Sequence, residues 1–217
     1  MNIQIDPALK DICPQLQLGI IQADVQVGDH SPDLWADIDA FVSGFDLETK
    51  DIASHPSIAA ARKCYRALGK DPTRYRLSSD SLFRRIAKNQ GLYQVNTVVD
   101  INNLLSLQSG HSIGAYDVSK IQGDILMRPG LEGEPYEGIG RGLLNIAGLP
   151  VLVDDQGPFG SATSDSPRTM VTNQTQKLML NIISFNGDGQ LMAWLERAQY
   201  LLETFANGEN TRIFVVD

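Results

Sequence analysis

Polar side chains recur at helical spacing in the stretch 96–107. Asn96, Asp100 and Asn103 stand at positions i, i+4 and i+7, so on a helix they share one face. Amides and carboxylates on such a face either contact a ligand, or cap neighbouring loops and satisfy buried backbone groups. The spacing alone leaves both alternatives open.

A second polar group lies in the loop 155–172. Two glycines permit a sharp turn there, and several hydroxyls and a carboxylate crowd beside Arg168. Such a turn can bind an anion through its hydroxyls and backbone N–H groups, and an arginine can fork onto a carboxylate or phosphate. The alternative is an Asp165–Arg168 pair that only holds the loop shut. We expect Thr163, Asp165 and Arg168 to contact a ligand.

The common templates for nucleophilic, metal and nucleotide chemistry are missing from the sequence. It contains no G-x-S-x-G, no H-E-x-x-H, no P-loop and no G-x-G-x-x-G. The histidines His30, His55 and His111 are scattered and form no ligand pair. The glycine-rich run 138–142 has no strand–turn–helix frame and predicts a turn. We therefore expect neither a metal nor a cofactor.

The net charge of -8 is unevenly distributed along the chain. Residues 1–60 carry ten acidic and two basic residues, whereas residues 62–88 carry nine basic and two acidic residues. A basic stretch with interleaved aromatics suits a phosphate backbone, but it also suits a solvated face or pairing with the acidic segment. The overall charge has the wrong sign for a dedicated RNA binder. The RNA-contact hypothesis rests on Arg74, Arg76, Arg84 and Arg85.

The composition, with 42% hydrophobic and 20% charged residues in a chain of 217, is that of a globular protein. The sequence shows no apolar run of membrane-spanning length and no signal peptide, so we expect a cytoplasmic protein without membrane contact. Cys13 and Cys64 lack metal-ligand spacing and predict two reduced thiols.

Helices are predicted mostly in the first half of the chain and strands in the second. Apolar spacing with proline, glycine and capping residues at the ends predicts helices over 31–44, 56–69, 78–88, 96–107 and 191–207. Runs rich in β-branched residues predict strands over 15–27, 121–128, 148–154, 169–172, 178–185 and 213–216, with a turn at 186–189. This order is typical of an α+β fold rather than of alternating β–α–β units.

The run from Asn96 to Asp117, N-T-V-V-D-I-N-N-L-L-S-L-Q-S-G-H-S-I-G-A-Y-D, resembles a known family. It is similar to the tRNA-editing (B-three/B-four) domain of the phenylalanyl-tRNA synthetase beta subunit, where N-x-V-V-D-x-x-N leads through a glycine turn to H-A-[FY]-D. The segment R-x-S-x-x-x-L-x-R-R from Arg76 to Arg85 and the loop at 157–169 resemble free-standing relatives of that domain. Two positions depart from the family: Gly114 stands where it has a pocket histidine, and Asn181 stands where we would look for its glutamate.

The resemblance implies a β-sandwich-like core of unusual topology flanked by helices. We expect a single domain over 1–217, with a helical N-terminal part at about 1–92, a motif-bearing part at about 93–185 and a C-terminal helix and strand at about 186–217. The ten residues to which a ligand role is assigned are Asn96, Asp100, Asn103, Gly114, Tyr116, Asp117, Thr163, Asp165, Arg168 and Asn181.

The resemblance also implies a function: a free-standing editing protein that recognises an aminoacylated tRNA end and hydrolyses a mischarged ester in trans. In that reaction the pocket orients a water and needs no side-chain nucleophile. Gly114 and the acidic total favour a rival, a non-catalytic module that binds RNA or a small amino-acid-like ligand. A protein-interaction domain that uses the acidic N-terminal segment is a third alternative. The sequence names neither the ligand nor the oligomeric state.

Overall fold

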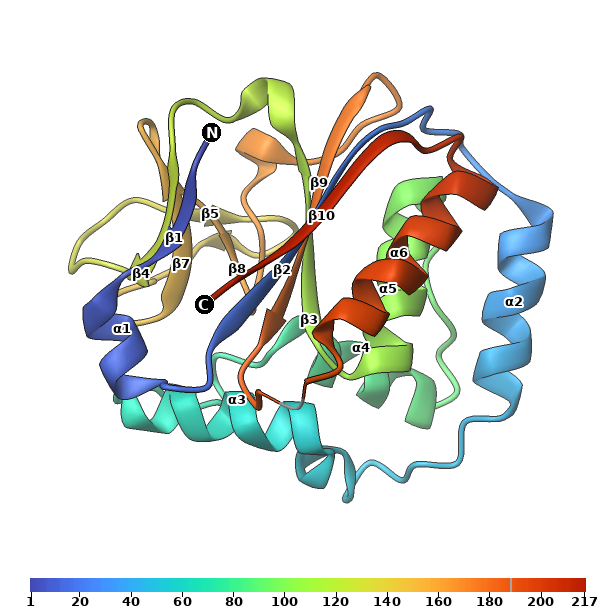
Figure 1. The fold of residues 1–217 in the computed structure, drawn as a ribbon. Helices are drawn as coiled ribbons and strands as arrows, with labels where there is room; N and C mark the ends of the chain where they lie inside the picture. Colours follow the sequence, from blue (N-terminus) through green and yellow to red (C-terminus); the bar gives the residue numbers. More distant parts are fainter. Residues whose placement is uncertain (188) are drawn as a thin grey trace.

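Two four-stranded sheets form the centre of the molecule (Figure 1). The computed structural model describes residues 1–187 and 189–217, so Asp188, part of the predicted turn at 186–189, lies outside the described residues. The central sheet is antiparallel throughout, in the order β10 (Glu209–Val216), β2 (Gln17–Asp24), β9 (Lys177–Ser184) and β3 (Ser112–Asp117). The second sheet has the order β1 (Ile3–Ile5), β4 (Ile125–Pro129), β7 (Pro150–Asp154) and β8 (Gly157–Ser161), and only its β1–β4 pair is parallel.

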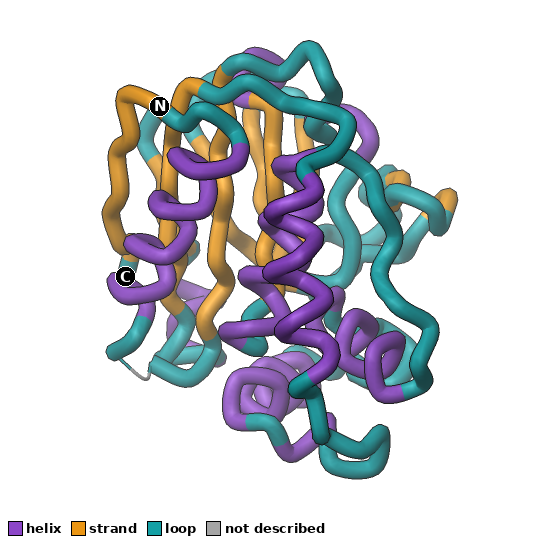
Figure 2. Tube along the Cα trace, turned by 90° about the vertical axis from the view of Figure 1, so that its right-hand side faces the viewer, coloured by secondary structure: helices purple, strands orange, loops and turns teal. Residues whose placement is uncertain are grey.

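The central sheet is covered on both faces, which explains its nearly continuous apolar strands. In β9, Met179 and Ile183 face the second sheet and belong to the core between the sheets. The alternate residues Leu178, Leu180 and Ile182 face the helices and belong to a second core. Figure 2 shows these helices in front of the strands. The predicted α+β class and sandwich-like core are therefore confirmed.

The helices α5 (Thr97–Ser109) and α6 (Leu191–Phe205) pack on the outer face of the central sheet, and α2 (Pro32–Ser43) lies outside them (Figure 1). The helices α3 (Pro56–Ala67) and α4 (Ser78–Ala87) run below the sheets in that view, and α1 (Pro7–Ile12) lies beside the second sheet. Among the described residues, three 3₁₀ turns join these elements, at Ile52–Ser54, Val118–Lys120 and Pro167–Thr169. No helix in the described part of the chain has the length and apolarity needed to cross a bilayer.

The ends of α5, the helix that carries the N-x-V-V-D-x-x-N pattern and is called the motif helix below, follow directly from its sequence. The Asn96 side chain accepts a hydrogen bond of 2.9 Å from the Val99 N–H and so caps the first turn of α5. Gly110 ends the helix in the left-handed conformation, with φ of 72°, and the chain turns there into β3. The short strand β3 brings the following residues back beneath α5 and beside β9.

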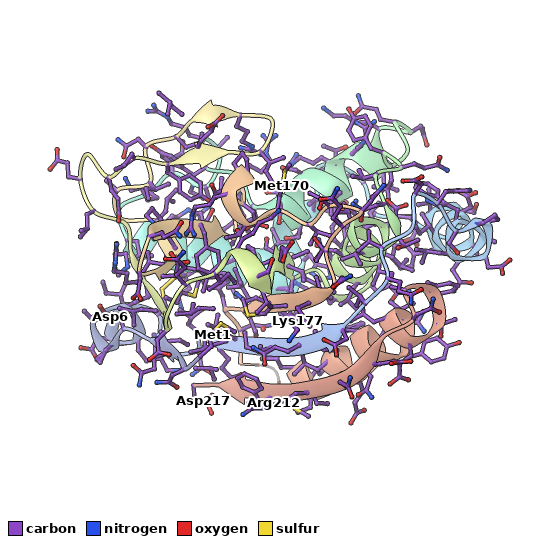
Figure 3. The ribbon with its side chains drawn as sticks, turned by 90° about the horizontal axis from the view of Figure 1, so that it is seen from above. Met1, Asp6, Met170, Lys177, Arg212 and Asp217 are labelled. Carbon is purple, nitrogen blue, oxygen red and sulfur yellow. A yellow bond between two sulfur atoms is a disulfide. The ribbon has the colours of Figure 1, made fainter. Side chains whose placement is uncertain are left out.

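One predicted strand is absent and another is shorter than predicted. The stretch 169–172 forms the end of a 3₁₀ turn and a single bridge from Met170 to Tyr116, because Pro167 starts a turn where a strand was expected. Figure 3 shows Met170 beyond the β3 edge of the central sheet, away from Arg212 in the edge strand β10. The strand predicted at 121–128 begins only at Ile125, since the Asp117 carboxylate accepts from the Ser119 N–H and starts a 3₁₀ turn.

The prediction of two reduced thiols was wrong. Cys13, at the end of α1, and Cys64, in α3, form a disulfide with their Cα atoms 5.6 Å apart. A separation of 51 residues hid this proximity, because the sequence gives no sign that α1 packs against α3. The bond ties the N-terminal helix to the helix that carries Tyr65.

Reduction of this disulfide is expected to lower the free energy of unfolding by about 2–4 kcal/mol, because the reduced unfolded chain regains the entropy of an open loop. Urea unfolding with and without a thiol reductant measures the difference. A Cys13→Ala/Cys64→Ala double variant is the control and should not respond to the reductant. Equal stability of the oxidised and reduced protein would contradict the expectation.

Candidate functional site

A cavity of about 550 Å³ opens where α4, α5, β3 and a two-stranded hairpin meet. The hairpin consists of β5 (Glu137–Gly138) and β6 (Gly142–Leu143) and contributes residues of its turn. We call this cavity the basic pocket. Its lining consists of Arg76, Ser78, Ser81, Leu82, Arg84, Arg85, Lys88, Gln90, Tyr93, Asn102, Asn103, Ser106, Ile113, Ile139, Arg141 and Thr163.

Amides and hydroxyls from α5 and the loop after β8 line part of the pocket. The Thr163 hydroxyl is 3.0 Å from the hydroxyl of Tyr65, which is fully buried in α3. Ser106 donates to the carbonyl of His111 at 2.6 Å, and Asn102 donates to the carbonyl of Ile113 at 3.2 Å. These bonds fix the polar groups, while the Asn103 side chain has no hydrogen-bond partner among the described residues. The pocket therefore offers oriented hydrogen-bonding groups and one uncommitted amide.

Five basic side chains line the same pocket: Arg76, Arg84, Arg85, Lys88 and Arg141. Among the residues that the structure describes, no carboxylate and no imidazole line this pocket. In that described part, Arg76, Lys88 and Arg141 also lack any side-chain hydrogen bond or ion pair. A hollow lined by charges of one sign attracts ligands of the opposite sign, in spite of the acidic total.

Arg84 has a structural task as well as a place in the pocket. It pairs with Asp80, whose side chain is fully buried, and Arg62 pairs with the same carboxylate at 3.0 Å. Removing one member of such a triad leaves a buried charge without its full compensation. Arg84 is therefore unsuited to a charge-reversal test of ligand binding. Arg74, which lies beside the ring of Tyr75, is exposed and does not line the pocket.

The three polar residues of the motif helix do not act together. Asn96 is the helix cap, and Asp100 accepts hydrogen bonds from the indole N–H of Trp35 at 2.7 Å and from the Val95 N–H at 3.1 Å. Burial raises the pKa of Asp100 against the lowering effect of these bonds. Asn96 therefore stabilises the start of α5 and Asp100 holds α5 to α2, while Asn103 alone of the three lines the basic pocket.

The loop after β8 is attached to the central sheet by one buried hydrogen bond. The hydroxyl of Tyr116, in β3, donates to Asp165 Oδ1 at 2.7 Å, and the Ser161 N–H donates to the same oxygen at 3.2 Å. The Tyr116 ring passes over Gly114 and Gly160, where any Cβ atom would collide with its hydroxyl. Burial raises the pKa of Asp165 to about 7, although both hydrogen bonds act in the opposite direction.

Asp117 and Arg168 are occupied within the loops. The two oxygens of Asp154 accept from Arg168 at 2.8 and 3.0 Å, so this arginine holds the loop shut, with Asp154 and not Asp165 as its partner. Asp117 accepts from Ser119 and from the Thr175 hydroxyl. Burial opposes ionisation of Asp117, but these hydroxyl and N–H donors hold its pKa below the ordinary value.

A family comparison adds to this geometry. The model of the B3/4 domain matches residues 60–205, which is more than half of the chain. This chain belongs to the B3/4 domain family. The matched region contains α4, α5, both hairpin strands and the loop after β8, and therefore the whole lining of the basic pocket.

Curated relatives of this chain are phenylalanine–tRNA ligase beta subunits by name. The protein from Streptomyces avermitilis is 39% identical over 84 residues, 37% of this chain and 10% of that protein. The one from Fusobacterium nucleatum is 27% identical over 146 residues, 64% of this chain and 16% of that protein. This B3/4 chain thus spans only about a tenth to a sixth of the length of these relatives. One similar solved structure is an N-terminal fragment of the phenylalanyl-tRNA synthetase beta subunit from Pyrococcus horikoshii. The superposition covers 99% of this chain and 50% of that fragment, with a TM-score of 0.47 and 13% sequence identity.

The two departures from the family pattern face each other in the B3/4 fold. Gly114 in β3 is the register partner of Asn181 in β9. Asn181 is fully buried, and neither polar atom of its side chain has a hydrogen-bond partner among the described residues. An amide in that state costs about 1–3 kcal/mol. The space beside Gly114 is filled by the Tyr116 hydroxyl, so Gly114, Tyr116 and Asn181 form part of the core between the sheets and do not line the basic pocket.

Of the residues predicted from sequence, the structure brings together Asn103, Thr163, Arg76, Arg84 and Arg85. The helix α5 and the loop after β8 are far apart in sequence. The strand β3, which follows α5, brings them together because its residue Tyr116 binds Asp165 of that loop. Sequence reasoning missed several lining residues: Ser78, Ser81, Lys88, Tyr93, Asn102, Ser106 and Arg141. Arg141 lies in the run predicted as a turn, and its charge between glycines was the signal that could have marked it.

We predict that Asp165→Asn changes how the stability of this B3/4 chain depends on pH. The folded pKa of about 7 exceeds the ordinary 3.8, so the native state keeps a proton that the unfolded chain releases between these values. The stabilisation from Asp165 is complete below pH 4 and is lost as the pH rises through about 7. The variant should therefore gain stability relative to the native sequence between pH 4 and 7, by at most about 1.4 kcal/mol per pH unit, and the difference should be constant above this range.

Urea unfolding at each pH measures this difference. The control is Asp37→Asn at an exposed position of α2, which makes the same change of charge outside the core. A difference between the native sequence and Asp165→Asn that stays constant over this range would show that Asp165 is ionised throughout.

Proposed function

We propose that the chain binds the aminoacylated 3′ end of a tRNA in the basic pocket and hydrolyses a mischarged ester there in trans. The observation that carries this proposal is the combination, in one cavity, of five basic side chains with amides and hydroxyls, and with no carboxylate among the described lining residues. The curated relatives, phenylalanine–tRNA ligase beta subunits by name, supply the tRNA context. Action as a separate protein is part of the proposal.

The charges of the pocket suit the phosphates of an RNA end. Arg76, Lys88 and Arg141 have no internal partners in the described part of the chain, so their charges are available to phosphate oxygens. A volume of about 550 Å³ is within the range of small-molecule sites and accommodates an aminoacyl ester. The phosphates would lie along the basic residues and the ester beside Asn103 and Thr163.

The proposed reaction needs a positioned water and no side-chain nucleophile. The water oxygen attacks the ester carbonyl carbon, the bond from that carbon to the ribose oxygen breaks, and the ribose oxygen takes up a proton. The products are the free amino acid and the uncharged tRNA. Asn103, Ser106 and Thr163 would hold the water and the carbonyl by hydrogen bonds, so that rate enhancement comes from orientation.

A second candidate is binding of the same RNA end without hydrolysis. It is favoured by the absence of a carboxylate or imidazole in the described lining, since nothing there can take a proton from the water. Gly114 at the family's histidine position favours it too. The two candidates share the ligand and differ only in the chemical step, so one assay separates them.

We expect the protein to release tyrosine from a tyrosine-charged phenylalanine tRNA faster than the uncatalysed reaction. Asn103→Ala and Thr163→Val should each lower that rate by about 10- to 100-fold, because the water loses its orientation. Asn2→Ala, at an exposed residue of the N-terminus, is the control and should keep the native rate. Release at the uncatalysed rate together with retained tRNA binding would establish the non-catalytic candidate.

Charge reversal should weaken tRNA retention in a salt-dependent way. The double variant Arg76→Glu/Arg141→Glu removes two phosphate contacts, so the slope of log affinity against log salt should fall in magnitude by about 1.4–1.8. Filter binding from 50 to 300 mM salt measures the slope. Arg74→Glu makes the same kind of charge change outside the pocket and should have a much smaller effect. Equal losses of tRNA affinity in the double variant and in Arg74→Glu would contradict binding in this pocket.

A further inference from the structure

Tyr93 is a conspicuous aromatic side chain in the lining of the basic pocket. It lies in the irregular segment between α4 and α5, and 67% of its surface is exposed. Single exposed aromatics are common on proteins and carry no meaning by themselves. Tyr93 differs from such residues in two respects, namely its position beside an array of basic groups and the way in which it is held.

Arg85 fixes the Tyr93 ring. The guanidinium carbon lies 3.7 Å from the ring centroid, so the cation covers one face of the ring. Arg85 also donates to the carbonyls of Gly91 and Gln90 and, at 2.9 Å, to the Tyr93 hydroxyl. No carboxylate among the described residues pairs with Arg85. The result is a held, positively charged platform of guanidinium and ring.

We propose that the exposed face of Tyr93 stacks a nucleobase of the RNA strand whose 3′ end enters the basic pocket. This inference rests on the proposed function and adds a base-binding subsite to it. Aromatic rings bind the bases of single strands by stacking and tolerate any base, because every base has a π-face. The basic residues Lys88 and Arg76 line the same pocket as Tyr93, and their charges suit the phosphates of that strand.

The charges around Tyr93 favour a nucleic acid strand over a protein segment as the ligand of this platform. A protein segment stacked on Tyr93 would have to satisfy Arg76, Arg85 and Lys88 with several carboxylates at once, whereas an RNA strand carries a phosphate at every nucleotide. A base flanked by phosphates matches a ring that lies in a pocket lined by cations. The platform thus selects for a single strand, since a base paired in a duplex hides its face.

Binding of charge-matched RNA tetranucleotides tests the platform. One has the 3′ sequence A-C-C-A, and in the others each nucleotide in turn is replaced by an abasic ribose phosphate. We expect loss of one particular base to weaken binding to the native protein by about tenfold, whereas Tyr93→Ala should not distinguish that abasic oligonucleotide from the complete one. Tyr93→Phe keeps the ring and should preserve the discrimination within about twofold. Thermal unfolding should change little in both variants, because the side chain is exposed and only its surface contacts with Arg85 are lost.

The possible outcomes separate the two levels of the proposal. If the native protein binds the complete strand and Tyr93→Ala discriminates against the same abasic strand as strongly as the native protein does, the stacking subsite is wrong and the proposed function stands. If the native protein binds none of the strands at 50 mM salt, both are wrong. A loss of discrimination in Tyr93→Ala that Tyr93→Phe restores supports the subsite.

Discussion

The site depends on the hydrogen bond between the Tyr116 hydroxyl and Asp165. It crosses from the central sheet to the loop after β8 and draws that loop towards β3. Two residues earlier in the loop, Thr163 is held by Tyr65 of α3 and lines the basic pocket. The loop is therefore attached to the central sheet and to α3, and one of its hydroxyls reaches the same cavity as Asn103 of α5. Without this attachment the part of the pocket wall that Thr163 contributes would lose its connection to the central sheet.

Some basic side chains of this fold form internal ion pairs, and others present their charge to the pocket. The stretch 62–88 looks uniformly basic in sequence, yet Arg62 and Arg84 are committed to the buried carboxylate of Asp80. Other members, Arg76 and Lys88, retain uncompensated charge and face the pocket with Arg85. This division explains how an acidic chain presents a basic hollow. It also shows why a count of basic residues overstates the charge that a ligand would meet.

The sequence predicted the fold class and most elements, because those depend on local signals. Ser31 caps a helix where expected, the helix predicted from Asn96 begins there, and Gly110 ends it. It could not predict which polar residues share the pocket. Asp100 was assigned to a ligand by its helical spacing, but α2 delivers Trp35 to it, and this contact depends on tertiary packing. Likewise the pairing of Cys13 with Cys64, and of Arg168 with Asp154, follows from how distant segments meet and leaves no local trace.

The two glycines beneath the Tyr116 ring have an evolutionary consequence. Neither Gly114 nor Gly160 can acquire a side chain while the ring stays in place, because each new Cβ atom would overlap the hydroxyl. An imidazole at position 114 and this orientation of Tyr116 are therefore mutually exclusive. A relative that combines such an imidazole with an aromatic at position 116, as in the family pattern H-A-[FY]-D, must therefore place the ring elsewhere, so a replacement at position 114 also changes the orientation of the Tyr116 side chain.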